Sequence, residues 1–433
     1  MRQLRPAEKI ASVLEATLLR RRARAHERLT PAEAQRDILS RLRRVVDLAY
    51  ATVPFYRDLY SRAGYEVGAL RTLDDLRYLP VTSKDDLVAS PPEASVSRSV
   101  PRSRLLPSIT SGTTGQVLTV WHDAARLGRI ALSIARVSEL VGRYRPWDTT
   151  LYVYTSPFPV GSVCGLFPFR FVPTTAPIDD IAEAWRRVRP AIVWIYPSRL
   201  RDLENAAADL PAPRLISVNS EASSAAERAR WEMAFRAPVR DQYATEELGI
   251  VAAECEARSR HVFSDSCWVE IVDGDGRSVS DGHLGRIVGT NLANTATPII
   301  RYDQGDRGAL VASRCECGRT LPVLEPLEGR ARLDFRTPSG QTVSSGVIVD
   351  ALYGLILNLG LPLRAYQLAD GNPPELRLVS ARPLTEDELR DAARHFRLAT
   401  GLETVCRIVE EIPRSPGGKR EALLPRQNPL ARK

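Results

Sequence analysis

The segment of this chain best suited to chemistry is Ser108–Gly115, which reads Ser-Ile-Thr-Ser-Gly-Thr-Thr-Gly. Five of its eight residues carry hydroxyl groups, two are glycines and one is apolar. Glycine lets backbone N–H groups approach an anion closely, and Ser and Thr hydroxyls add further donors. The segment therefore predicts a phosphate-binding loop, although it lacks the Gly-Lys-Ser/Thr ending of the common P-loop. A polar surface turn is the alternative.

Three cysteines and a histidine form a second set of chemically suited side chains. Cys255 and His261 are separated by five residues, and Cys315 and Cys317 follow in a Cys-Glu-Cys-Gly sequence. Three thiolates and one imidazole suit a tetrahedral Zn²⁺ ion, so we expect these four residues to bind zinc. Reduced buried thiols are the alternative, because Cys-x-Cys is tighter than the common Cys-x-x-Cys spacing. Cys267 is a spare ligand candidate.

Lysine is rare in this chain, and one lysine stands in a glycine-rich segment. Only four of the 60 basic side chains are lysines. Lys419 directly follows Gly417 and Gly418 in a loop that begins at Pro413. A lysine ammonium is a compact charge on a flexible stem, and arginine reproduces it poorly. The sequence therefore offers Lys419 as a catalytic candidate, and a solvated basic tail is the alternative.

Length, composition and charge exclude several classes of protein. A chain of 433 residues exceeds what one compact core holds, and 44% hydrophobic with 26% charged residues is typical of globular proteins. The net charge of +8 comes from arginines spread along the whole chain, which argues against nucleic-acid binding. No apolar run is long enough to span a membrane, Met1–Pro6 lacks a signal-peptide core, and six cysteines are too few for a disulfide scaffold. We therefore expect a cytoplasmic protein without nucleic-acid or membrane partners.

The candidate residues must be positioned by strands that alternate with helices. Leu151–Tyr154 and Ala191–Tyr196 have the apolar runs of buried parallel strands. Ile178–Val188, which lies between them, has helical spacing, so the three segments together predict a βαβ unit. Residues 1–60 predict helices that precede this unit.

Two further regions complete the predicted organisation. Residues 215–330 are richer in strands, one of which we expect at Thr297–Ile300. The last region carries a helix capped at Thr385 by a Thr-Glu-Asp-Glu box. We therefore predict an α/β fold with a large multi-sheet N-terminal domain, residues 1–329, and a small mobile α+β C-terminal lid, residues 330–433.

Six motifs occur along the chain in the order seen in AMP-forming acyl-adenylating enzymes. They are the hydroxyl-rich loop, Asn219–Ala222, Tyr243–Glu247, Arg301–Asp306, Gly329-Arg330 and Gly417–Lys419. Three further segments, Val53–Arg57, Leu76–Lys84 and Cys315–Pro322, are similar to the phenylacetate–CoA ligase-like branch. The chain therefore resembles the acyl-CoA synthetase superfamily over residues 45–425, and this branch in particular.

The resemblance implies a two-step ligase reaction. A carboxylate attacks the α-phosphate of ATP, which gives an acyl-adenylate and pyrophosphate, and a thiol, usually that of CoA, then displaces AMP. It implies ATP, Mg²⁺ and CoA as cofactors and co-substrates, a small-molecule carboxylic acid as substrate, and a homodimer as a candidate assembly. Some members of the branch carry a Cys/His set of this spacing, which implies that the zinc is structural.

The resemblance also assigns roles to individual residues. It implies that Lys419, on the lid, bridges the carboxylate and the α-phosphate while charge develops there. It implies that Asp306 accepts the ribose hydroxyls and that Tyr243 stacks on the adenine. The remaining nucleotide-binding positions that it implies are Ser111, Gly112, Thr113, Thr114, Gly115, Ser220, Glu221, Ala222, Gln242 and Arg330.

The Mg²⁺ ligand can be placed in two registers. The family pattern is Tyr-Gly-x-Ser/Thr-Glu, and counting four residues from Tyr243 gives Glu247, which we prefer. Thr245-Glu246 reproduces the Ser/Thr–Glu pair one residue earlier, so Glu246 is the alternative. Thr245 and both carboxylates are therefore catalytic candidates, and a carboxylate faces Mg²⁺ in either register.

The final acceptor and the acid are left open by the sequence. Leu333 stands where the family has an acidic hinge residue, which bears on the second half-reaction. The alternatives are a carrier-protein thiol or an amine as acceptor, a small oxyacid such as nitrite as substrate, and an inactive homologue that only binds nucleotide. The aromatic segments Tyr154–Gly161, Phe167–Phe169 and Tyr196–Ser198 would suit an aryl or arylacetic acid, and would pack a core equally well.

Overall fold

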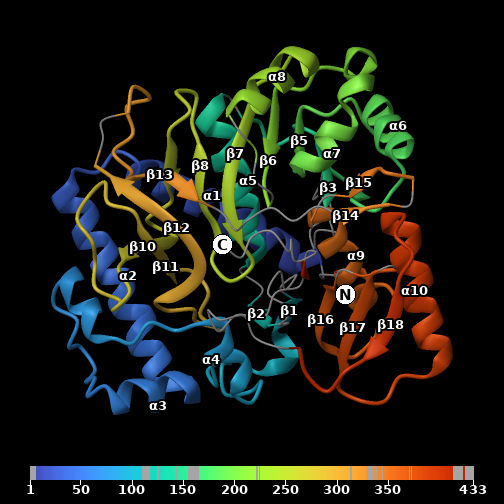
Figure 1. The fold of residues 1–433 in the computed structure, drawn as a ribbon. Coiled ribbons are helices and arrows are strands. Elements are labelled where there is room, and N and C mark those ends of the chain that lie inside the picture. The colour runs from blue at the N-terminus through green and yellow to red at the C-terminus, as the bar shows by residue number, and fades with distance from the viewer. Residues whose placement is uncertain are drawn as a thin grey trace, which may run out of the picture.

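The chain combines one large sheet with a smaller sheet built by its last part (Figure 1). The computed structural model describes residues 6–109, 118–123, 126–142, 144–154, 165–220, 223, 225–312, 315–328, 335–337, 339–343, 345–369, 371, 373–412 and 423–424. The mixed α/β class predicted from the sequence is confirmed. The boundary between residues 329 and 330 stays a prediction, because residues 329–334 lie outside the described residues.

Helices make up the first part of the chain, as predicted. The helix α2 (Pro31–Thr52) begins at a capping box, in which Thr30 N donates to the Glu33 carboxylate at 2.9 Å, and it buries a stripe that includes Leu42 and Val46. The other elements are α1 (Pro6–His26), α3 (Pro54–Arg62), η1 (Leu73–Tyr78), α4 (Lys84–Ala89), η2 (Arg102–Arg104) and the antiparallel pair β1 (Leu106–Ile109) and β2 (Thr119–His122).

One half of the 11-stranded sheet is parallel. Its strands lie in the spatial order β4 (Phe169–Pro173), β3 (Thr150–Tyr154), β5 (Ile192–Ile195), β6 (Leu215–Val218) and β7 (Val239–Thr245). All four residues of β5 and of β6 are buried, as is usual for parallel strands covered on both faces. The predicted βαβ unit is therefore confirmed, with its helix over the predicted residues.

Helices cover both faces of this parallel half. On one face, Trp185 and Trp231 pack in the same hydrophobic cluster as Val193 and Ile216. On the other face, Ile134 packs in the same cluster as Trp194. The helices concerned are α6 (Ile178–Val188), α7 (Pro197–Asp202), η3 (Glu204–Asp209) and α8 (Ala225–Phe235) on the first side and α5 (Arg126–Val141) on the second.

The other half of the large sheet is antiparallel. From β7 outward, its strands are β8 (Gly249–Glu254), β9 (Arg260–Val262), β13 (Val323–Glu328), β12 (Tyr302–Val311), β11 (Gly285–Asn291) and β10 (Cys267–Val272). The prediction of a strand at Thr297–Ile300 is wrong, since this segment is irregular. Pro298 within it has no N–H to donate to a ladder.

The N-terminal region is joined to the large sheet by a backbone bridge. Thr82 pairs with Tyr302 in a parallel arrangement, in which Thr82 N donates to Arg301 O and Asp303 N donates to Thr82 O, each at 2.8 Å. Ile300 lies in the same hydrophobic cluster as the buried faces of α2 and α3. The start of β12 is therefore held in place by residues more than 200 positions earlier in the chain.

The last part of the chain forms its own sheet and core, at the lower right of Figure 1. The helix α10 (Glu386–Thr400) begins at Thr385, where the capping box with Glu388 is present as predicted. Leu352 and Phe396 are fully buried in this core. The remaining elements are β14 (Phe335–Arg336), β15 (Thr342–Val343), α9 (Ser345–Leu357), β16 (Leu363–Ala369), β17 (Glu375–Ser380), β18 (Val405–Ile408) and β19 (Leu423–Leu424).

Candidate active site and metal centre

The structure brings together two candidate residues that lie 63 positions apart. Tyr243 is on β7 and Asp306 is on β12, and the Tyr243 hydroxyl donates to Asp306 Oδ2 at 2.8 Å. Both side chains are half-buried. A tyrosine ring and an adjacent carboxylate present a flat apolar surface beside a strong acceptor. This pair can contact a ring and a neighbouring diol of one ligand.

The two carboxylates that follow Tyr243 have different surroundings. Glu247 is buried and accepts a hydrogen bond from the Tyr302 hydroxyl at 3.0 Å. Glu246 is half-buried and accepts a hydrogen bond from the hydroxyl of Ser108. The loop predicted to begin at Ser108 begins later, because Ser108 and Ile109 belong to β1 and pair with β2. The structure therefore separates the two candidates, with Glu246 on the side of the loop and Glu247 on the side of β12.

The strand register shifts close to the two candidate carboxylates. Tyr243 pairs with Ala252 of β8, but Ala244 pairs with Ile250, so β8 has one more residue than β7 across this stretch. Thr245 Oγ1 then accepts a hydrogen bond from Leu248 N at 3.1 Å and closes the turn between the strands. A β-bulge re-aims side chains in this way, and bulges are common beside active sites.

Ser220 is the one nucleotide-binding candidate of the segment after β6 that lies within the described residues. Its φ angle of 67° lies in the left-handed region. Its hydroxyl donates to Asn219 Oδ1 at 3.0 Å and is 3.0 Å from the Tyr154 hydroxyl. Because β3 and β6 are parallel, their carboxyl ends meet at one edge of the sheet, which is where α/β proteins bind ligands.

Several candidates fall outside the described residues, and the structure does not place them. These are Ser111, Gly112, Thr113, Thr114, Gly115, Glu221, Ala222, Arg330 and Lys419.

The motif Arg301–Asp306 contains contacts that the sequence did not reveal. Arg301 is 1% exposed, donates from Nη2 to Gly276 O at 3.0 Å and forms an ion pair with Glu270 at 3.0 Å. It therefore joins chain segments and does not face a ligand. The hydroxyl of Tyr302, in contrast, reaches Glu247. Its position next to Arg301 in the motif is the signal that could have identified Tyr302.

The four Cys/His candidates converge, as the sequence predicted. Their ligand atoms all lie within 4.8 Å of one another. Cys255 Sγ is 3.6 Å from Cys315 Sγ, and Cys317 Sγ is 3.2 Å from His261 Nε2. Bonds of about 2.0–2.3 Å to a tetrahedral zinc ion place ligand atoms roughly 3.5–3.8 Å apart. The donor set and its spacing therefore fit Zn²⁺, and Cys267 is not part of the cluster.

The surroundings of the cluster also suit a metal. His261 Nδ1 is 3.2 Å from Leu321 O, which orients the ring so that Nε2 faces the thiols. Burial raises the pKa of the Cys255 thiol to about 12. Burial also acts on Cys315, but hydrogen bonds from Ser259 and Cys317 outweigh it and lower the pKa of that thiol to about 6. Thiols this close together release their protons most readily to a bound cation.

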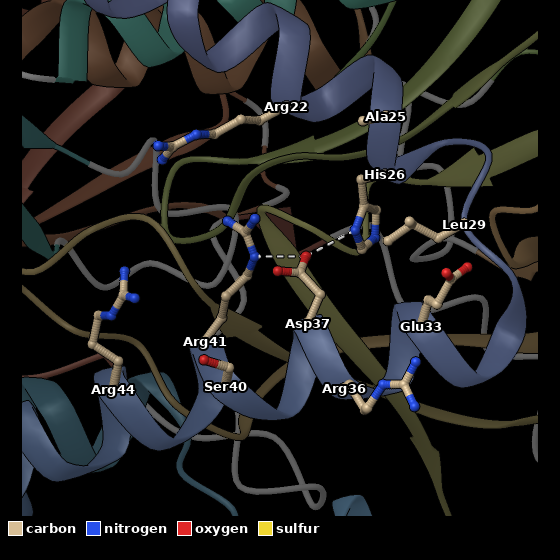
Figure 2. Close-up of a pocket in the computed structure, with 10 residues that line it drawn as sticks. All are labelled: Arg22, Ala25, His26, Leu29, Glu33, Arg36, Asp37, Ser40, Arg41 and Arg44. Carbon is tan, nitrogen blue, oxygen red and sulfur yellow. Dashed lines mark hydrogen bonds and ion pairs between the residues drawn. The ribbon is translucent and has the colours of Figure 1, made fainter.

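A separate groove lies between α1 and α2 (Figure 2). It has a volume of about 550 Å³ and is lined by basic side chains that include Arg22, Arg41 and Arg44. Asp37 Oδ2 lies between His26 Nδ1 and Arg41 Nε, at 2.9 Å from each (Figure 2). No candidate catalytic, nucleotide-binding or metal-binding residue lines this groove.

Within the described part of the chain, we find no helix that combines the length and the apolar character needed to cross a membrane.

Comparisons with known proteins agree with the motif order. No protein-family model matches the chain. It is 29% identical over 312 residues to a phenylacetate–coenzyme A ligase of Thermus thermophilus, which covers 67% of this chain and 68% of that protein. It is 26% identical over 321 residues to the Escherichia coli phenylacetate–coenzyme A ligase, covering 67% and 70%.

Solved structures share the fold. An open form of 2-hydroxyisobutyryl-CoA ligase, in complex with its acyl-AMP and CoA, is 24% identical with a TM-score of 0.62, covering 92% of this chain and 93% of that one. The same ligase in its thioester-forming state is 23% identical with a TM-score of 0.64, covering 93% and 92%. The sequence relatives and the six ordered motifs together support an AMP-forming ligase similar to the phenylacetate–coenzyme A ligases, and the solved structures share its fold.

Proposed function

We propose that the protein activates a carboxylic acid with ATP as an acyl-adenylate and then forms an acyl-CoA thioester, with release of pyrophosphate and AMP. The observation that carries this proposal is the pairing of Tyr243 with Asp306 at the edge where Glu246 and Ser108 also meet. The sequence relatives are named phenylacetate–coenzyme A ligases, which supports a CoA ligase activity for this chain.

ATP would lie across the ends of β6, β7 and β12. The ring of Tyr243 would stack on the adenine, and Asp306 would accept the ribose hydroxyls. Thr110–Gly115 would donate to the β- and γ-phosphates, since Glu246 lies against Ser108 of β1, the strand that leads into this segment. Ser220, Glu221, Ala222 and Arg330 are the further nucleotide-binding candidates, whereas Gln242 faces the opposite side of β7 from Tyr243.

Charge at the α-phosphate would be balanced from two sides. Mg²⁺ would neutralise phosphate oxygens, with Glu246 or Glu247 as its ligand and Thr245 beside them. The contact with Ser108 favours Glu246, since Glu247 is buried against the Tyr302 hydroxyl. Lys419 would place its ammonium between the carboxylate and the α-phosphate, where it stabilises charge that is greatest in the transition state.

We also propose that Cys255, His261, Cys315 and Cys317 hold a structural Zn²⁺. All four ligands come from the protein and surround one point, as in structural zinc sites, whereas a catalytic site keeps one position for water or substrate. A cytoplasmic location and a homodimer stay predictions.

The test is ATP–pyrophosphate exchange with a panel of carboxylic acids and nitrite, followed by mass spectrometry of the products. Exchange that depends on an acid, together with a CoA thioester, supports the proposal. Acid-dependent exchange with a product formed only on an added amine or carrier protein would move the acceptor to those groups. Tight AMP binding without exchange for any substrate would contradict the proposal and leave a nucleotide-binding protein. Glu246→Gln and Glu247→Gln, compared for Mg²⁺ dependence, decide which carboxylate binds the metal.

A further inference from the structure

Four neighbouring strands present their side chains in two rows on the face covered by α5. In the first row, Trp194 of β5 is in register with Ser217 of β6, and Ser217 is in register with Arg240 of β7. Side chains two residues apart on a strand point the same way. The second row, nearer the carboxyl ends, therefore contains Tyr154 of β3 and Gln242 of β7. Tyr196, directly after β5, lies beside Tyr154.

Gln242 and Tyr243 are successive residues of β7, so their side chains point to opposite faces of the sheet. Tyr243 packs against the cluster that contains Leu248 and Tyr302, and its hydroxyl reaches Asp306. Gln242 pairs with Ala253, which belongs to the α5-side cluster. Gln242 thus faces away from the nucleotide-binding candidates Tyr243 and Asp306.

Three side chains in these rows carry buried polar atoms that have no hydrogen-bond partner within the part of the chain that the structure describes. These atoms are Trp194 Nε1, Ser217 Oγ, and both Oε1 and Nε2 of Gln242. Gln242 is 2% exposed, Trp194 5% and Ser217 0%. Buried polar groups in proteins are nearly always paired, and an unpaired one is costly. Neighbouring unpaired groups of this kind indicate a polar occupant.

Aromatic rings lie beside this polar patch. The Tyr152 and Tyr154 rings are stacked with centroids 4.7 Å apart, and the Tyr154 and Tyr196 rings meet edge to face at 4.9 Å. Flat aromatic surfaces favour an aromatic ligand. An indole N–H can only donate, whereas a hydroxyl and an amide can both donate and accept. The occupant must therefore offer a flat ring and a group that both donates and accepts hydrogen bonds.

We infer that the acid activated by this protein is an aromatic acid with a hydroxyl or amino substituent, and that Gln242 hydrogen-bonds this substituent, with Ser217 and Trp194 at the deeper end of the patch. The inference rests on the proposed function, because it takes the carboxyl edge of the sheet as the place of adenylation. A ring without the substituent would leave the same buried atoms unpaired, and sites built to bind a polar group reject analogues that lack it.

The experiment compares kcat/KM in ATP–pyrophosphate exchange for three pairs of acids. Phenylacetate is paired with hydroxyphenylacetates, and benzoate is paired with hydroxybenzoates and with aminobenzoates. We expect the best substituted acid to exceed its parent by about 10-fold or more. Gln242→Met keeps the side-chain length and removes the amide. In this variant we expect kcat/KM for the substituted acid and kcat/KM for its parent to lie within a few-fold of each other.

Tyr60→Phe is the matched control. The Tyr60 hydroxyl is also fully buried, also has no partner among the described residues, and belongs to α3 outside the two rows. This variant should keep the wild-type ratio of kcat/KM for the substituted acid to kcat/KM for its parent. Thermal unfolding of Gln242→Met, with and without each acid, shows that the variant is folded. It also gives a second readout, in which the substituted acid loses its stabilising effect while the parent acid keeps its own.

The possible results distinguish a failure of the inference about the acid from a failure of the proposed adenylating function. Exchange with parent acids that equals or exceeds exchange with substituted ones would overturn the inference and leave the adenylating function standing. A wild-type preference that persists in Gln242→Met would show that water fills the patch and would also overturn it. Exchange with no acid of any class would overturn the proposed function and the inference together.

Discussion

The Cys/His cluster and the polar patch under α5 are both built from buried polar side chains, yet their hydrogen-bonding groups are arranged differently. In the cluster, the thiols and the imidazole lie against one another, and the second nitrogen of His261 is 3.2 Å from a backbone carbonyl. In the patch, Gln242 and Ser217 have no partner among the described residues. Polar groups that pair with one another, as in the cluster, stabilise the folded state. Buried polar groups without a partner, as in the patch, are available to pair with a ligand.

The comparison predicts that the two regions respond in opposite ways to mutation. Damage to the cluster should lower stability and leave the chemistry of the surviving molecules unchanged. Damage to the active-site edge should lower turnover or affinity and leave stability unchanged. The following predictions test this contrast, from the largest expected effect to the smallest.

The largest effect should come from loss of the metal. Structural zinc contributes apparent binding free energies of about 10–16 kcal/mol in small domains, which is as large as the whole stability of a typical protein. Cys317→Ser should therefore abolish zinc retention and give little soluble, cooperatively unfolding protein. Metal analysis and thermal unfolding measure both quantities. Cys406→Ser, in β18 outside the cluster, is the control. A Cys317→Ser protein that unfolds like the wild type would remove the structural role.

Lys419→Ala should show the reverse pattern. Removing a charge that acts mainly in the transition state should lower kcat for ATP–pyrophosphate exchange by about 100- to 1,000-fold. The thermal unfolding midpoint should stay at the wild-type value. Arg420→Ala, at the next residue of the chain, should retain most of the activity. Near-normal exchange in Lys419→Ala would assign this lysine to a solvated tail.

Tyr243→Phe should affect ATP affinity more than turnover. The variant keeps the ring and removes the 2.8 Å hydrogen bond to Asp306. Asp306 loses the hydrogen bond that orients it toward the ribose, and a resulting loss of about 1.4 kcal/mol in nucleotide binding would raise KM for ATP about 10-fold. Steady-state kinetics at saturating acid measure the change. Tyr50→Phe removes an exposed hydroxyl bond to Ser61 and should leave KM unaltered. An unchanged KM in Tyr243→Phe would place the nucleotide elsewhere.

The smallest effect should come from Ser217→Ala. Removing a buried hydroxyl that has no partner costs no hydrogen bond, so stability should stay the same or rise by up to about 1 kcal/mol. Denaturant unfolding of the protein without substrate measures this. A loss of about 2 kcal/mol would show that the hydroxyl is already paired in the free protein. The contrast between cluster and patch would then fail.

Local patterns in the sequence were sufficient to predict individual helices and their caps. The helix at Ile178–Val188 and the capping box at Thr385 depend on residues close together in the chain, and both were predicted correctly. The convergence of Cys255, His261, Cys315 and Cys317 was also predicted correctly, because these residue types are the usual ligands of one metal ion. The prediction of a strand at Thr297–Ile300 was wrong. It relied on the apolar composition of the segment, although Pro298 has no N–H to donate to a neighbouring strand.

The features that the sequence did not predict depend on which strands become neighbours in the sheet. The polar patch exists because β5 lies between β3 and β6, and no spacing along the chain places Trp194 beside Ser217. The register shift between β7 and β8 is likewise a property of the pair of strands. Arg301 belongs to a recognised motif, but only its contacts reveal that it joins segments.

The bridge between Thr82 and the start of β12 has a consequence for how the chain is made. Thr82 and Arg301 are 219 residues apart. At roughly 5–20 residues per second, about 10 to 45 s pass on the ribosome between the synthesis of these two residues. During that interval the apolar faces of α2 and α3 lack the cover that Ile300 later gives them. The nascent N-terminal helices therefore expose apolar surface for seconds before the segment that covers it has been made.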